Sequence, residues 1–374
     1  AGASAPLIFV LTSIAWREAW KYQSRAYRYC LLDMGHAWQS LALAARAIGC
    51  ESFALGHFPD DRVAETCVLN EDEWPMLVIG IHGGIHGGVH GGVRGVGRGG
   101  LHGASIPAGN SAGTAAPVET ILHGGRPNRL SERQEKYTLI EQIHAATKLG
   151  VEAAIPVPGQ PETSGRGETG LPAAVSTSPS TNLSIGRGFG DVVRGRRSAL
   201  DFRGGSESIS FAHLAAILST TRERFSADFA TARFVQLYVY VHRVEGLAPG
   251  VYRYGPERAE LEKIKEGDQR LAAAALSLGQ DLAGNACLAV SMIGDFENAA
   301  RRYGDRGYRY VHFEAGAIGQ RMYLAAEALG LRATGIGAFF DDQVHQYLGL
   351  PPEVGQVVYH FAIGYPVRDT RLEA

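Results

Sequence analysis

Two stretches of the chain show the same succession of apolar and polar positions. Each begins with an apolar run typical of a strand, residues 7–12 and 287–293, and continues through a tyrosine-containing turn into an Ala- and Leu-rich helical pattern. The helical patterns end at Gly49 and Gly330, where a residue that tolerates positive φ suits a helix C-terminus. A Gly-x-Phe turn with two aspartates, a short helix and a closing strand follow in both. The pattern predicts two copies of one unit.

Alignment of the two stretches shows a repeat with constant spacing. Tyr27 and Tyr308 stand 281 residues apart. The same spacing joins further identical pairs that begin at Gly35, Gln39, Ala44, Gly49, Gly56, Phe58, Asp60 and Leu69. A slip of three residues is expected before the closing strand, because Gly80 and Gly364 are 284 residues apart. A repeat of this length indicates duplicated structure.

The second copy extends further upstream than the first. An alternating strand pattern at 235–241 precedes it, so the complete second unit is expected to span residues 186–368. The first copy, residues 1–81, corresponds only to the back half of such a unit. We therefore expect a complete unit preceded by an incomplete one.

The segment between the copies differs from both. Residues 82–127 are rich in Gly and His, and His82, His86 and His90 recur every four residues. That spacing would align three imidazoles on a helix, but each glycine disfavours a helix by about 1 kcal/mol relative to alanine. We expect a linker and no metal site. Residues 128–185 then contain one helical pattern, which ends at Gly150, and a bridging loop rich in Pro, Ser and Thr.

The composition excludes several classes of protein. The chain has 374 residues, of which 36 are Lys or Arg and 38 are Asp or Glu, so it lacks the basic excess typical of nucleic-acid binders. Its longest apolar runs are far shorter than the about 20 residues of a membrane span. Four cysteines without Cys-x-x-Cys spacing, and no basic segment before the first apolar run, favour a cytoplasmic protein. Neither nucleic acid nor a membrane is expected as a partner.

Two short segments are candidates for binding an anionic, flat ligand. Arg196, Arg197 and Ser198 place two guanidinium groups and a hydroxyl together, which suits a phosphate. Residues Gly335, Ile336 and Gly337 form a Gly-x-Gly bend where a backbone can approach a ligand closely. A solvated basic turn and an ordinary tight turn are the respective alternatives.

A tyrosine beside a cation occurs at the same place in both copies. Lys21 precedes Tyr22, and Arg302 precedes Tyr303. A neighbouring cation stabilises a phenolate, so either tyrosine could transfer a proton. The alternative is an amphipathic surface pair.

Several catalytic motifs do not occur in the expected contexts. These are the motifs of P-loop nucleotide triphosphatases, Rossmann dehydrogenases, Gly-x-Ser-x-Gly hydrolases and His-Glu-x-x-His zinc proteases.

The order of these motifs resembles the nitroreductase superfamily. It is similar to the SagB-type, azoline-dehydrogenase-like branch, whose long members carry two units in tandem. The resemblance rests on the segments RRSxxxF (196–202), HRVEGLAPGVYRY (242–254), YGDRGYRY (303–310), EAGAIGQ (314–320), GIGAFFDD (335–342) and IGYP (363–366). It departs from the family at Leu200, where a basic residue is usual, and at residues 228–231, which replace a loop that normally shapes the flavin pocket.

The resemblance implies an α+β fold with a mainly antiparallel sheet flanked by helices and two tandem units forming a pseudo-dimer. It implies FMN between the units, with the phosphate on Arg196, Arg197 and Ser198 and the ring beside residues 335–337. Proton transfer falls to the Lys21–Tyr22 pair or to Tyr303.

The function implied is an FMN-dependent oxidoreductase, dehydrogenating azolines to azoles in a ribosomally made peptide. A general NAD(P)H-dependent nitro or quinone reductase and a flavin-free binding scaffold are the alternatives. The expected partners are a small-molecule or peptide substrate, and a second copy or an upstream fragment that completes the first unit.

Overall fold

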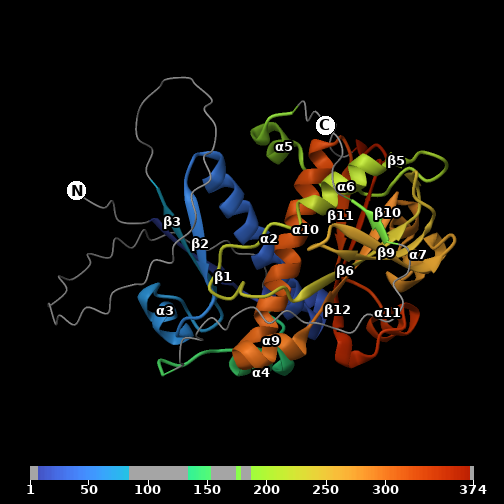
Figure 1. Ribbon diagram of the computed structural model, residues 1–374. Coiled ribbons are helices and arrows are strands. Elements are labelled where there is room, and N and C mark those ends of the chain that lie inside the picture. Colours follow the sequence, from blue (N-terminus) through green and yellow to red (C-terminus); the bar gives the residue numbers. More distant parts are fainter. Residues whose placement is uncertain (1–6, 84–133, 153–173, 178–186, 371–374) are drawn as a thin grey trace, which may run out of the picture.

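The computed structural model describes residues 7–83, 134–152, 174–177 and 187–370, and two main antiparallel sheets lie on either side of long central helices (Figure 1). The smaller sheet, with order β1-β3-β2, consists of β1 (Leu7–Ser13), β2 (Glu51–Leu55) and β3 (Trp74–His82). The helices of this first unit are α1 (Trp16–Tyr22), α2 (Ala26–Ala47) and α3 (Asp60–Thr66).

The larger sheet has the order β11-β12-β10-β6-β8-β9-β4. Its strands are β4 (Ala174–Ser176), β6 (Val235–Val241), β8 (Gly250–Gly255), β9 (Glu260–Glu266), β10 (Leu288–Gly294), β11 (Arg332–Ile336) and β12 (Gln356–Gly364). A short parallel pair is formed by β5 (Ile209–Ser210) and β7 (Val244–Glu245). The helices of the second unit are α5 (Phe189–Gly195), α6 (Phe211–Ser219), α7 (Arg270–Leu276), α8 (Asp281–Asn285), α9 (Phe296–Tyr303), α10 (Gly307–Ala328) and α11 (Asp341–Leu348). The expected α+β class with antiparallel sheets is confirmed.

The two copies of the repeat fold alike. β1 pairs with β3 as β10 pairs with β12, and both pairs have an irregular register at the equivalent position of the first strand. Gly80 lies opposite Ile8, and Ala362 lies opposite Ala289. Gly80 therefore corresponds to Ala362, 282 residues further on, and not to Gly364. The slip is one residue, and the expected slip of three was wrong.

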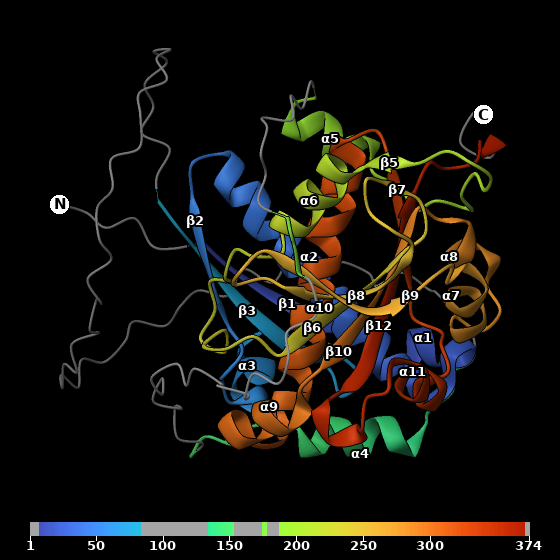
Figure 2. The same cartoon turned by 45° about the vertical axis from the view of Figure 1, so that its right-hand side comes forward.

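The helices α2 and α10 cross at the centre of the molecule (Figures 1 and 2). A Cβ atom on Gly35 or Gly316 would lie 2.3 Å or 2.1 Å from a backbone oxygen of the other helix, so both positions require glycine. Tyr27 and Tyr308 stack with ring centroids 6.4 Å apart and an interplanar angle of 10°. Because each pair is related by the repeat and is also in contact, a pseudo-two-fold axis passes between the helices.

A buried ion cluster joins the units on one side of this axis. Asp60 of the first unit accepts from Arg306 at 2.6 Å and from Arg309 at 2.8 Å, and none of the three side chains is more than 1% exposed. Arg306 also donates to the carbonyl oxygen of Gly56. The arginines of one unit thus bind the aspartate of the other.

The equivalent cluster on the other side has the same partners exchanged. Asp341 of the second unit accepts from Arg25 and Arg28 of the first, each at 2.8 Å, and its side chain is 34% exposed. Arg25 also donates to the carbonyl oxygen of Gly337. The reciprocal clusters make the tandem units a pseudo-dimer within one chain.

One helix of the region between the units is described. The pattern expected within 128–150 forms α4 (Thr138–Ala146), which lies at the lower end of the central helices in Figure 1 and places Ile140 near Ala19 and Trp74 of the first unit. Most of the 82–127 linker, with His86 and His90, lies outside the described residues. Among those described, no group of His, Cys, Asp or Glu side chains could hold a metal ion. None of the described helices has the length and apolarity needed to cross a membrane.

The strand β1 is an edge of the smaller sheet in the part of the chain that the structure describes. Its counterpart β10 pairs on that side with β6, whereas β1 pairs only with β3. Leu7 and Ile8 are each 59% exposed along this strand. An exposed apolar edge favours pairing with another strand, in keeping with the partner expected from the sequence.

Replacing Ile8 with Lys is expected to reduce self-association through this edge, because a charged side chain on an edge strand opposes pairing. Sedimentation velocity over a concentration series measures the effect. Leu271→Lys is the matched control, since Leu271 is 89% exposed on α7, away from the edge. Equal sedimentation of both variants and the parent chain would count against the edge as an association surface.

Candidate active site

The two motif segments expected to share a ligand lie side by side. Ser198 forms an isolated parallel bridge with Ala333 of β11, which brings the Arg-Arg-Ser segment against the strand that ends at the glycine bend. The hydroxyl of Tyr323 links the segments: it accepts from the Gly335 amide at 2.8 Å and lies 2.9 Å from the Ser198 hydroxyl. The two segments are therefore neighbours in the structure, and their sharing one ligand stays a prediction.

The two arginines of this corner carry no carboxylate partner among the described residues. Arg196 lies over the Tyr323 ring at 5.1 Å, and Arg197 donates to backbone carbonyl oxygens of Arg194 and Arg196. Arg197 and Ser198 are exposed. Two permanently charged guanidinium groups and a hydroxyl at a surface suit a phosphate.

The glycine bend packs against tyrosines on its inner side. A Cβ atom on Gly335 would lie 1.9 Å from the Tyr359 hydroxyl, and one on Gly337 would lie 2.4 Å from the Tyr29 ring. Tyr29, from the first unit, also donates a hydrogen bond of 2.8 Å to the Gly337 carbonyl oxygen. Close contact with a tyrosine therefore explains why glycine is required at both positions. The position of a flavin ring beside residues 335–337 stays a prediction.

The bend at Gly56, which is the pseudo-symmetric equivalent of the bend at Gly337, is filled by two side chains of the second unit. The carboxylate of Asp228 accepts from the amides of Gly56 and His57 at 2.8 Å and 3.1 Å. The Phe229 ring stacks on Tyr310 with centroids 4.4 Å apart and an interplanar angle of 10°. An acceptor and a flat ring from the chain itself thus close the first unit's site. Asp228 and Phe229, in the segment 228–231 that replaces the usual pocket loop, thus contact the bend at Gly56 and not the bend at Gly337.

The bend at Gly337 has the equivalent amides and tyrosine, but no described residues fill it as Asp228 and Phe229 fill the bend at Gly56. None of the described acceptors takes the amides of Gly337 and Ala338, the equivalents of Gly56 and His57. Tyr29, the equivalent of Tyr310, has no parallel ring stacked on it in the described part of the chain. Two adjacent amides, and a tyrosine ring on which no described ring is stacked, suit the acceptor edge and plane of an isoalloxazine ring. The residues present therefore fit FMN at this site.

The Lys21–Tyr22 pair of the first unit lies beside the second unit's bend. The Tyr22 ring meets Tyr29 edge to face at 4.6 Å, and Tyr29 bonds to Gly337. The ammonium of Lys21 lies 5.0 Å from the centre of the Tyr22 ring. Tyr22 is partly exposed, and no described group forms a hydrogen bond with its hydroxyl. The pair therefore adjoins the glycine bend through Tyr29.

Tyr303 lies next to Tyr310, at the bend of Gly56 that Asp228 and Phe229 fill. Its hydroxyl is 2.7 Å from the hydroxyl of Thr231, and its side chain is buried against Phe234 and Tyr310. Burial raises the pKa of Tyr303, and the opposing effects of Thr231 and Arg302 do not compensate. Desolvation outweighs the charge of Arg302 at this phenol, and a role of Tyr303 in proton transfer stays a prediction.

Three residues that the motif analysis did not select complete the site: Tyr29, Tyr323 and His36. His36 lies 3.1 Å from Gln320 and 3.2 Å from the Tyr359 hydroxyl. Burial lowers the pKa of His36 to about 4, so its imidazole is neutral at pH 7. The repeat contained a signal for Tyr29, whose equivalent is Tyr310, but nothing in the sequence distinguished it from a core tyrosine.

Comparison with known proteins identifies relatives of both units. The model of the Nitroreductase family matches residues 1–84 and 193–365. A crystal structure of a protein provisionally named a nitroreductase, from Anabaena variabilis, aligns with a TM-score of 0.71 and 26% identity over 96% of this chain and 69% of that chain.

Two curated proteins match parts of the sequence. A protein of Methanocaldococcus jannaschii, provisionally named a nitroreductase, is 37% identical over 114 residues, which are 30% of this chain and 58% of that protein. Trifolitoxin operon protein TfxC of Rhizobium leguminosarum bv. trifolii is 31% identical over 125 residues, 33% of this chain and 35% of that protein. The matches span about half and about a third of these two relatives.

Proposed function

Because the chain belongs to the nitroreductase family, we propose that it is an FMN-dependent oxidoreductase with its flavin site at Gly337. The carrying observation is the contrast between the two pseudo-symmetric bends. Asp228 and Phe229 fill the place at Gly56, whereas the amides of Gly337 and Ala338 and the face of Tyr29 have no equivalent plug in the described part of the chain.

The chain's own residues would bind and orient the cofactor. Arg196 and Arg197 would hold the phosphate, and Ser198 would bond to the adjoining ribityl end. The amides of Gly337 and Ala338 would donate to the acceptor edge of the ring. When bound, FMN supplies hydride transfer, which no amino-acid side chain provides.

Tyr22 is the residue that we assign to proton transfer. Tyr22 is partly exposed beside the bend, and the Lys21 ammonium, 5.0 Å from the centre of its ring, would stabilise negative charge that develops on the phenol. For the substrate, we propose a thiazoline or oxazoline in a ribosomally made peptide, oxidised to the azole, as the sequence resemblance implies.

Replacing Arg196 with Ala is expected to weaken FMN binding roughly 10- to 100-fold, since a hydrogen bond to a charged group contributes about 1.5–3 kcal/mol. Quenching of flavin fluorescence during titration with the protein measures the affinity. Arg194→Ala is the matched control, because Arg194 pairs with Asp191 on exposed α5. Failure of the parent chain to take up FMN would overturn the proposal and favour a flavin-free scaffold.

A further inference from the structure

A cavity of about 390 Å³ lies outside the site described above, beside α4. Its walls come from the second unit, from α2 and from the edge of α4 that carries Ile143 and Ala146. The side chains that matter here are Arg28, Phe296, Ala300, Tyr308, His312 and Val358. A groove of this size and largely apolar lining is large enough for a ligand or for several side chains of a partner.

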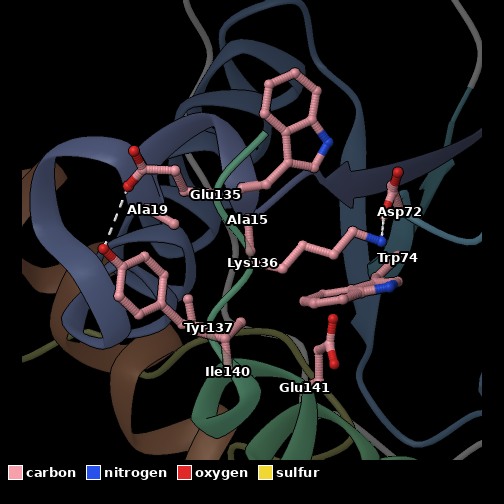
Figure 3. Close-up of a pocket in the computed structure, with 10 residues that line it drawn as sticks. Ala15, Ala19, Asp72, Trp74, Glu135, Lys136, Tyr137, Ile140 and Glu141 are labelled. Atoms are coloured by element: carbon pink, nitrogen blue, oxygen red, sulfur yellow. Dashed lines mark hydrogen bonds and ion pairs between the residues drawn. The ribbon is translucent and has the colours of Figure 1, made fainter. Parts of the chain in front are cut away.

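The pseudo-two-fold axis relates this groove to a face of the first unit that is already covered. Tyr308 corresponds to Tyr27, Ala300 to Ala19, and Arg28 to Arg309. On the first unit, α4 and the residues just before it lie over this face, and a cavity of only about 20 Å³ is left (Figure 3). Among the described residues, only α4 covers a face in this way. The equivalent face of the second unit forms the wall of the groove.

The contacts that bind α4 to its face indicate which groups of a ligand the groove could bind. Arg309 donates to the hydroxyl of Thr147 at 2.8 Å, and Arg306 donates to the Thr147 carbonyl oxygen at 3.0 Å. The Arg309 guanidinium also reaches the carbonyl oxygen of His144. Arginines therefore meet the carbonyl end of the helix, where its dipole is negative. At the rim, Lys148 forms an ion pair with Asp61.

The groove presents the equivalent groups. Arg28 replaces Arg309, and exposed Asp342 replaces Asp61. His312 stands where the first unit has Leu31, and it is 1% exposed. Its Nδ1 donates to the Tyr308 carbonyl oxygen at 2.8 Å, whereas its Nε2 has no hydrogen-bond partner among the described residues. His312 is among the residues that line the groove, so a donor from a bound segment would complete its hydrogen bonding.

We propose that this groove binds an amphipathic helical segment of a partner polypeptide, in the manner in which α4 binds the first unit. Its apolar face contacts Phe296, Ala300 and Val358, and its carbonyl end meets Arg28. A lysine near that end pairs with Asp342, and a hydroxyl or amide donates to His312. The charge pattern of the groove matches that of the face that α4 covers, so a polypeptide helix is favoured over a small molecule.

A synthetic peptide with the sequence of residues 136–150 is the probe, since it carries the α4 pattern including Thr147 and Lys148. Labelled at its N-terminus and titrated with the whole chain, it should show saturable binding in fluorescence anisotropy. Ala300→Trp should weaken binding about tenfold or more, because an added ring overfills the groove. A Lys148→Glu peptide should bind about two- to fivefold more weakly.

Arg301→Trp is the matched control, because Arg301 neighbours Ala300 on α9 but pairs with Glu297 on the exposed face. This variant should bind the peptide like the parent chain. Absence of saturable binding by the parent chain would overturn the proposal. Equal binding by the Ala300→Trp and Arg301→Trp variants would overturn it as well.

Discussion

Replacing Asp60 with Asn is expected to lower the free energy of unfolding by about 3–5 kcal/mol, the range for removing one partner from a buried ion pair. The variant leaves the guanidinium groups of Arg306 and Arg309 in the interior without a compensating charge. Urea denaturation followed by circular dichroism measures the loss.

The pseudo-symmetric variant Asp341→Asn provides the control within the same molecule. Asp341 binds Arg25 and Arg28 in the same geometry, but its side chain is 34% exposed, so each pair is worth only about 0.2–1 kcal/mol. The loss should therefore be about 1 kcal/mol. Equal losses for the two variants would show that burial does not distinguish the clusters.

The effect of Asp60→Asn should also depend on pH. Burial alone would raise the pKa of Asp60, but Arg309 and Arg306 together outweigh burial and lower it. A carboxyl group with a lowered pKa stabilises the fold above its unfolded-state pKa, and this contribution is lost as the pH falls through the folded-state value. The difference in stability between the parent chain and the variant should therefore shrink in acid.

The repeat allowed the sequence to predict the pseudo-dimer but not its cross-unit contacts. Gly35 and Gly316, like Tyr27 and Tyr308, were recognised as equivalents, and equivalents that touch must lie near a common axis. That Asp60 binds arginines of the other unit could not be predicted, because spacing along the chain does not report which copy a side chain faces. The one-residue slip was also missed, since glycines at the strand ends do not fix the strand register.

The same exchange between units determines which bend each segment adjoins. Residues 228–231 belong to the second unit and stand where the resemblance places a loop that shapes the flavin pocket. They close the bend at Gly56 of the first unit, where Phe229 stacks on Tyr310. Conversely, Lys21 and Tyr22 of the first unit lie beside the bend of the second. The sequence identifies such segments, but the pseudo-two-fold axis determines which of the two bends each segment adjoins.

If the flavin binds at Gly337 as proposed, the asymmetry of the two bends assigns proton transfer to Tyr22 and not to Tyr303. Replacing Tyr22 with Phe should lower turnover about 10²- to 10⁴-fold, the usual contribution of a positioned acid or base. Tyr303→Phe should leave turnover within about twofold, because that hydroxyl is bound to Thr231 at the closed bend. Loss of two hydrogens from a thiazoline-containing peptide, followed by mass spectrometry, measures turnover, with bound FMN first matched by its absorbance. Because the Phe ring keeps the edge-to-face contact with Tyr29, a loss confined to Tyr22→Phe at equal flavin content would isolate the phenolic proton. A larger loss in Tyr303→Phe would instead assign proton transfer to the other bend.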